Sequence, residues 1–121
     1  METNNELIEK DYDDNEITYE EYPSGDCFTS AYRNVIINKQ YKLVHGIVTN
    51  AYGKRYIHAW CEYENKAYDT TSNMVVPVKI YYEVGRIEYT VRYTFQEAIH
   101  NFIETDSYGY WHPMFNEFKE E

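Results

Sequence analysis

Apolar residues recur at intervals of three and four positions between residues 27 and 38, which is the spacing of one face of an α-helix. They are Phe28, Ala31, Tyr32, Val35 and Ile36. A cluster of turn-forming residues precedes them, and its Ser24 and Asp26 are candidates to accept hydrogen bonds from the first amides of a helix. We therefore expect a helix from about Cys27 to Asn38, with Cys27 in or beside its first turn.

Three segments rich in β-branched and aromatic residues follow, at about 41–49, 55–63 and 66–70. Residues 50–53 and 64–65 carry the turn chemistry that joins neighbouring strands of a hairpin. We therefore predict that these three segments form an antiparallel meander.

Strand propensity continues over residues 78–84 and 86–93. Thr94 and Glu97 then match a capping box, in which the two side chains satisfy free amides at the start of a helix. We expect this second helix to extend to about Glu104 and to pack on the sheet, because its apolar residues share one side. Those apolar residues are Phe95, Ala98, Ile99, Phe102 and Ile103.

The length of 121 residues corresponds to about one domain. Its 43% hydrophobic and 18% aromatic content, with 15 tyrosines, favours a folded and strand-rich core over disorder. We therefore predict a single α+β domain over residues 23–121. In this domain the helix that bears Cys27 packs on an antiparallel sheet, and a second helix lies near the C-terminus.

The formal net charge of -10 is concentrated at one end of the chain. Residues 1–26 contain ten acidic side chains and one lysine, a net charge of -9, so the rest of the chain carries only -1. Because the leader is acidic and poor in apolar residues, we expect residues 1–22 to be solvated and flexible. The acidic leader could also attract a basic partner protein. The chain has no basic stripe to offset phosphate charge, which argues against direct nucleic-acid binding.

The chain shows no apolar run of the kind found in signal peptides or membrane spans. Its two cysteines and four histidines lack the spacing of a structural zinc site, so we expect no metal and no cofactor. Reduced thiols and a cytoplasmic location are the expectation for such a chain.

Cys27, His58 and Asp69 are the candidate catalytic residues. Nucleophilic thiol chemistry requires a thiolate, and the free amides at a helix start favour negative charge there. A histidine within reach can take the thiol proton, and a carboxylate on the other ring nitrogen can orient that histidine. The order of the three residues along the chain is compatible with these roles.

A two-residue turn at 64–65 would bring His58 and Asp69 together across a hairpin. Because side chains alternate along a strand, one face then carries four polar or aromatic residues. They are His58, Trp60, Asp69 and Thr71. Asp69 becomes the diagonal neighbour of His58, with Cβ atoms roughly 7 Å apart, which is close enough for the side chains to meet. Cys61 points to the other face, so we interpret it as a core cysteine.

These motifs resemble the papain-like and transglutaminase-like superfamily of Cys-His-Asp enzymes. The likeness covers about residues 25–82 and rests on three stretches, Gly25-Asp26-Cys27-Phe28, His58-Ala59-Trp60 and Tyr68-Asp69-Thr70-Thr71. The resemblance implies that Cys27 is the nucleophile, His58 the general base and acid, and Asp69 the orienting group. Trp60, on the same predicted face, could shield the pair from water.

The chain departs from the papain-like pattern just before the cysteine. Those enzymes usually place a glutamine there as an oxyanion donor, whereas this chain has Glu20, Glu21 and Tyr22. Carboxylates cannot donate a hydrogen bond and would repel an oxyanion. The candidate donors are therefore the backbone amide of Cys27 and the side chain of Tyr22.

We expect a thiol-dependent hydrolase or acyltransferase that acts on an amide bond in a protein, a peptide or a small amide. Peptidase, amidase, deamidase and transglutaminase reactions all use the same three residues, and the sequence does not choose among them. The alternative is a small acidic interaction or inhibitor protein with a vestigial triad. In that case Cys27 is a buried helix residue, His58 a satisfied sheet residue and Asp69 a turn cap. We interpret His45 and His100 as structural or exposed.

Overall fold

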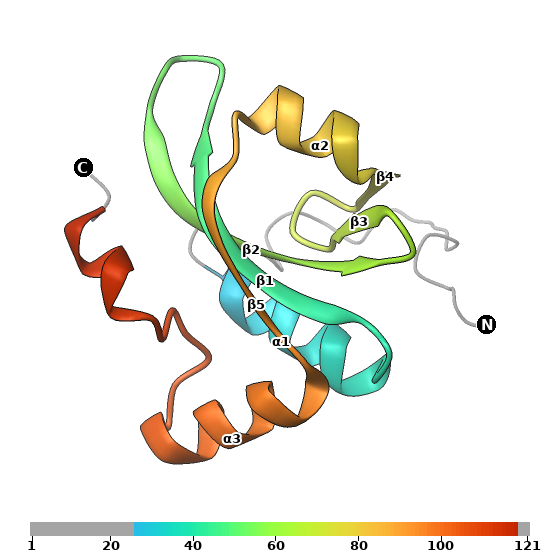
Figure 1. Cartoon of the computed structure of the whole chain (residues 1–121), viewed down its shortest axis with the longest axis vertical. Coiled ribbons are helices and arrows are strands. Elements are labelled where there is room, and N and C mark those ends of the chain that lie inside the picture. The colour runs from blue at the N-terminus through green and yellow to red at the C-terminus, as the bar shows by residue number, and fades with distance from the viewer. Residues whose placement is uncertain (1–25, 119–121) are drawn as a thin grey trace.

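The computed structural model describes residues 26–118, which form three α-helices, five strands and a short 3-10 helix (Figure 1). The predicted leader at 1–22, including Tyr22, and the predicted cap Ser24 lie outside the described residues. The elements in chain order are α1 (Cys27–Ile37), β1 (Lys42–Thr49), β2 (Arg55–Tyr63), β3 (Lys66–Asp69), β4 (Met74–Pro77), α2 (Val78–Gly85), β5 (Glu88–Tyr93), α3 (Phe95–Thr105) and η3 (Pro113–Glu117).

The strands form one sheet in the order β4-β3-β2-β1-β5, and every neighbouring pair is antiparallel. The predicted meander of the first three strands is therefore confirmed. Tyr63 pairs with Lys66 across a two-residue turn in which Glu64 and Asn65 both have positive φ, 52° and 67°. Turns of this kind match the natural twist of a hairpin, so the turn sets the register that brings His58 close to Asp69.

The segment 78–84 is a helix, so the strand predicted there is wrong. Strand β4 has only four residues and ends before the predicted strand segment begins, and α2 starts directly after Pro77. The residues Val78, Tyr81 and Tyr82 have helical spacing, and they pack together against one face of the sheet. Strand propensity was therefore outweighed by tertiary packing. Strand β5 begins at Glu88, after Arg86 closes α2 in a left-handed conformation.

The sheet buries both of its faces, in agreement with the predicted α+β class. Helix α1 covers one face, where its Ala31 and Val35 pack with Leu43, Ala59 and Cys61. Helix α2 lies on the opposite side of the sheet, as Figure 1 shows. The core on the α2 side contains Val44, Val48, Trp60, Ala67 and Tyr81.

Helix α3 starts at the predicted capping box. The Thr94 hydroxyl accepts from the Glu97 amide at 3.1 Å, and the Glu97 carboxylate accepts from the Thr94 amide at 2.9 Å.

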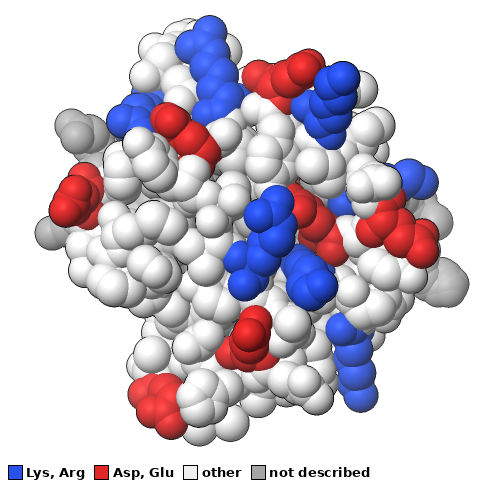
Figure 2. Space-filling view, viewed as in Figure 1, with Lys and Arg blue, Asp and Glu red and all other residues white. Residues whose placement is uncertain are grey.

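None of the helices within residues 26–118 is long and apolar enough to cross a membrane. Figure 2 shows acidic and basic side chains interspersed over one face of the molecule.

Candidate active site

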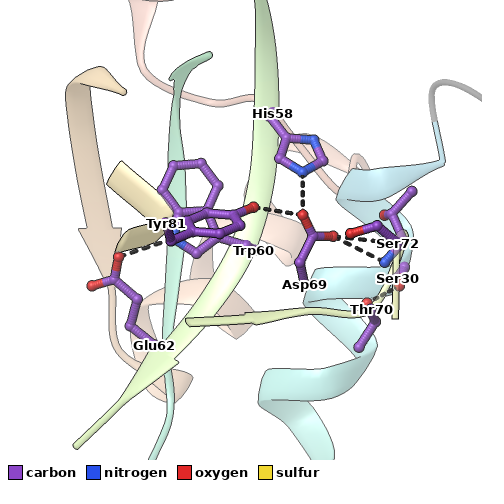
Figure 3. Close-up of polar contacts among 9 residues, drawn as sticks. Ser30, His58, Trp60, Glu62, Asp69, Thr70, Ser72 and Tyr81 are labelled. Atoms are coloured by element: carbon purple, nitrogen blue, oxygen red, sulfur yellow. Dashed lines mark hydrogen bonds and ion pairs between the residues drawn. The ribbon is translucent and has the colours of Figure 1, made fainter. Parts of the chain in front are cut away.

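His58 and Asp69 form a hydrogen-bonded ion pair at the point where β3 ends. The pairing of Cys61 with Tyr68 makes Asp69 the diagonal neighbour of His58, as the predicted register requires. The His58 Nε2 atom lies 2.9 Å from Asp69 Oδ2 (Figure 3). The side chains are 12% and 6% exposed, so water screens this pair far less than a surface ion pair. The sequence-based pairing of these two residues is confirmed.

Asp69 accepts four hydrogen bonds. Its Oδ2 atom accepts from His58 and from the Tyr81 hydroxyl, which lies 2.5 Å away. Its Oδ1 atom accepts from the backbone amides of Thr71 and Ser72, at 3.1 and 3.3 Å. Burial alone raises the pKa of Asp69, but the bonds from His58, Tyr81 and the Ser72 amide together hold that pKa below its usual value. Asp69 is therefore a fixed carboxylate at neutral pH.

Tyr81 is a site residue that the sequence analysis missed. It extends from α2 to the same Asp69 oxygen that His58 contacts, as Figure 3 shows. Burial raises the pKa of Tyr81 and the Asp69 charge raises it further, so its hydroxyl stays protonated and donates. The signal in the sequence was the helical spacing of Val78, Tyr81 and Tyr82, which the strand propensity of the segment concealed.

Cys27 is the first residue of α1, at the end of the helix that lies beside this pair. The N-cap residue Asp26 makes no side-chain hydrogen bond to the first turn. One turn further along α1, the Ser30 hydroxyl contacts the hydroxyl of Thr70, the residue directly after Asp69. This contact ties the start of α1 to the end of β3, where His58 and Asp69 meet. The Cys27 side chain is buried, with 6% exposure.

Cys27 and Asp69 both act on the protonation of His58. Burial alone lowers the pKa of His58, but hydrogen bonding and charge from Asp69 and Cys27 raise it more, to about 10. The ring therefore carries a proton at neutral pH, and Asp69 stabilises that charge. Since Asp69 occupies Nε2, the ring nitrogen left for the thiol is Nδ1.

Trp60 packs against the His58 ring and is held there by a polar network. The two rings are stacked, with centroids 5.8 Å apart and planes 27° apart. The Trp60 Nε1 atom donates to Glu62 Oε2 at 2.9 Å, and Glu62 also pairs with Arg92 at 3.1 Å. A Cβ atom at Gly46, which pairs with His58, would lie 2.9 Å from the Trp60 ring. Trp60 is fully buried, so it excludes water from one side of His58.

The remaining cysteine and histidines of the described chain lie apart from this cluster. Cys61 is fully buried, and its thiol lies 3.3 Å from the Ala31 carbonyl, to which it donates. Burial raises the pKa of the Cys61 thiol, which makes it a poor nucleophile. His45 is fully buried on the other face of the sheet, and His100 is exposed on α3. Within residues 26–118, no group of three or more His, Cys, Asp or Glu residues is arranged to hold a metal ion.

Cys27, His58, Asp69 and Tyr81 thus combine a thiol at a helix start, a protonated imidazole, a buried carboxylate and a phenol that fixes the carboxylate. Chemically, such a cluster can exchange a proton between the thiol and the ring while the carboxylate holds the ring in place. In comparisons with known proteins, the chain matches no family model, no curated protein and no solved structure. The papain-like and transglutaminase-like resemblance stays a prediction from the motifs.

Proposed function

We propose that this protein is a thiol-dependent hydrolase or acyltransferase that acts on an amide bond. The observation that carries the proposal is the 2.9 Å bond between His58 Nε2 and Asp69 Oδ2, on a histidine whose protonation is also shifted by Cys27. A thiol nucleophile needs a histidine that can hold the proton of the thiol and that has a fixed orientation. Contacts with Asp69 and Cys27 favour the protonated ring of His58, and Asp69 holds its Nε2 atom.

In the proposed reaction, Cys27 attacks the carbonyl carbon of the amide as the thiolate partner of the protonated His58. The His58 imidazolium then gives its Nδ1 proton to the departing amine as the carbon–nitrogen bond breaks. The product is a thioester on Cys27. Water or a second amine next attacks the thioester and gives its proton to the neutral His58. The carbon–sulfur bond then breaks, which releases the acid or the new amide and restores the thiolate and the imidazolium. Asp69 accepts from Nε2 throughout and keeps the imidazolium stable.

The tetrahedral intermediate needs hydrogen-bond donors for its negative oxygen. The first-turn amides of α1 next to Cys27 are suited to this, because helix N-termini favour negative charge and Asp26 makes no side-chain cap there. Tyr22 stays a predicted second donor. We propose a protein, peptide or small amide as the substrate, and a cytoplasmic location because both cysteines are free. A basic partner for the acidic leader also stays a prediction.

Selective alkylation tests the proposal. We expect limiting iodoacetamide at neutral pH to modify Cys27 in the folded protein, because Cys27 keeps 6% exposure, and to spare Cys61, which has no exposed surface and donates to the Ala31 carbonyl. Peptide mass mapping reports the site, and a denatured sample in which both cysteines react is the positive control. The variant Cys27→Ala should show no labelling while folded.

The contribution of His58 is tested with a matched histidine. We expect His58→Ala to slow Cys27 alkylation and to lower turnover of an amide substrate by about 10²-fold or more, because it removes the base. The control His100→Ala changes an exposed histidine on α3 and should leave both rates unchanged. Alkylation confined to Cys61, or equal rates in the two variants, would contradict the proposal and favour a non-catalytic interaction protein.

A further inference from the structure

A pocket of about 510 Å³ opens between α2 and the sheet, and His58 and Asp69 are part of its wall. The remaining wall is largely apolar. Its large aliphatic residues and methionine are Val48, Met74, Val76, Ile80, Val84 and Ile87. A pocket of a few hundred Å³ with apolar walls and a few polar groups is typical of small-molecule sites.

The polar groups of this pocket select against a charged ligand. No lysine or arginine is among its described wall residues, and the one acid, Asp69, already accepts four hydrogen bonds. A carboxylate or ammonium group entering the pocket would therefore lose its hydration without gaining an ionic partner of its own, because His58 and Asp69 are already paired with each other. An uncharged apolar group meets no such penalty.

Exposed apolar side chains gather at the rim of the pocket. Eight large hydrophobic residues are exposed within residues 26–118, and three of them lie on this pocket: Met74 at 42%, Ile80 at 50% and Val84 at 77% exposure. Clustering of exposed apolar side chains at one cavity marks a binding surface better than the same residues scattered singly.

We propose that this pocket binds an uncharged, apolar acyl group of the amide substrate, one larger than a benzene ring. A cavity of about 150 Å³ is enough to hold benzene, and this pocket is roughly three times as large. The inference rests on the proposed function, since the pocket reaches the site through His58 and Asp69. It narrows the substrate from amides in general to amides with a bulky neutral acyl group.

Binding can be measured without turnover in the variant Cys27→Ala, with Cys27→Ser as a second background should the first not fold. The probes are N-hexanoylglycinamide, N-acetylglycinamide and the adipoyl analogue, whose chain ends in a carboxylate. We expect the hexanoyl probe to bind more tightly than the acetyl probe by roughly fourfold per added methylene, on the order of 10²-fold in total. The adipoyl probe should bind no better than the acetyl probe.

The isoleucine methyl signals in NMR spectra locate the binding. We expect Ile80 and Ile87 to shift on titration, because they line the pocket, and Ile37 and Ile103 to stay unchanged, because they are exposed elsewhere. Ile80→Asn should weaken hexanoyl binding about tenfold. The reason is that a polar side-chain amide replaces apolar atoms of Ile80 that would otherwise contact the acyl chain. The matched control Ile103→Asn should leave binding unchanged.

Each outcome separates this inference from the proposed function. Equal affinities for the hexanoyl and acetyl probes, tight binding of the adipoyl probe, or equal effects of the two isoleucine variants would overturn the inference. Chain-length-dependent binding at Ile80 and Ile87 supports the inference, even if the wild-type protein hydrolyses none of the probes and the proposed function fails. If the wild-type protein turns over amides at a rate that does not depend on acyl length, the proposed function is supported and the pocket assignment is contradicted.

Discussion

Removal of the Tyr81 hydroxyl should measurably destabilise the fold, because that group donates to a buried carboxylate. Tyr81 is 8% exposed, and its hydroxyl lies 2.5 Å from Asp69 Oδ2. Hydrogen bonds to charged groups contribute about 1.5–3 kcal/mol. In Tyr81→Phe, Asp69 keeps its three other donors, so we expect a loss of about 2 kcal/mol in the free energy of unfolding. For a domain of this size that corresponds to a drop of roughly 10 °C in Tm.

Urea denaturation followed by tryptophan fluorescence measures this loss. The control is Tyr52→Phe, which removes the hydroxyl of a tyrosine that is 94% exposed. A surface change of that kind should alter the free energy of unfolding by no more than about 0.5 kcal/mol. A second, functional readout is Cys27 alkylation, which we expect to slow in Tyr81→Phe because the carboxylate that orients His58 is less firmly held.

The pH dependence separates a charge-assisted bond from simple packing. The lowered pKa of Asp69 contributes stability that is present above its ordinary value of 3.8 and is lost as pH falls through the folded pKa. The Tyr81 hydroxyl supplies part of that lowering. The difference between wild type and Tyr81→Phe should therefore be largest near pH 7 and shrink below about pH 4. A loss under 0.5 kcal/mol, or a difference that stays constant down to pH 3, would refute the reasoning.

Further predictions concern the pH limits of stability and the packing around the site. His45 is buried, and neither of its ring nitrogens has a hydrogen-bond partner within residues 26–118. Burial lowers its pKa to about 3, so stability should fall as pH drops from about 6.5 towards 3. In His45→Leu that fall should be smaller in urea titrations, and an unchanged acid limb would exclude His45 as its source. The raised pKa of His58 contributes stability that is complete below about 6.5 and is lost as pH rises towards about 10. His58→Gln should flatten this alkaline loss, and a wild-type stability that is constant from pH 7 to 10 would contradict the assignment. Gly46→Ala should cost about 1–3 kcal/mol, because the added Cβ meets the Trp60 ring at 2.9 Å. Urea midpoints measure that cost, and a neutral result would mean that Trp60 is free to shift.

Much of the candidate site was predictable because it depends on local rules. Alternation along a strand and a two-residue turn at Glu64 and Asn65 were enough to pair His58 with Asp69 and to turn Cys61 to the other face. The start of α1 at Cys27 followed from helical spacing and turn chemistry just before it. These features involve residues close in sequence, so their geometry is set by backbone periodicity.

The role of Tyr81 was not predictable from the same rules. Residues 78–84 carry β-branched and aromatic side chains that suit a strand, and they also place Val78, Tyr81 and Tyr82 at helical intervals. Only packing against Trp60 and the sheet favoured the helix. The helical conformation in turn places the hydroxyl of Tyr81 next to Asp69. Intrinsic propensity is a local property, so it does not include contacts with residues that are distant in sequence.

By itself, the sequence determined the three-strand meander, the helix start at Cys27, the capped start of α3 and the shared face of His58 and Asp69. Only the tertiary structure decided that α2 covers this face, that Tyr81 holds Asp69, and that an apolar pocket reaches the pair. The physical reason is the range of the interactions involved. Strand alternation, turns and caps act between neighbours along the chain, whereas a pocket exists only after elements far apart in sequence have packed against each other.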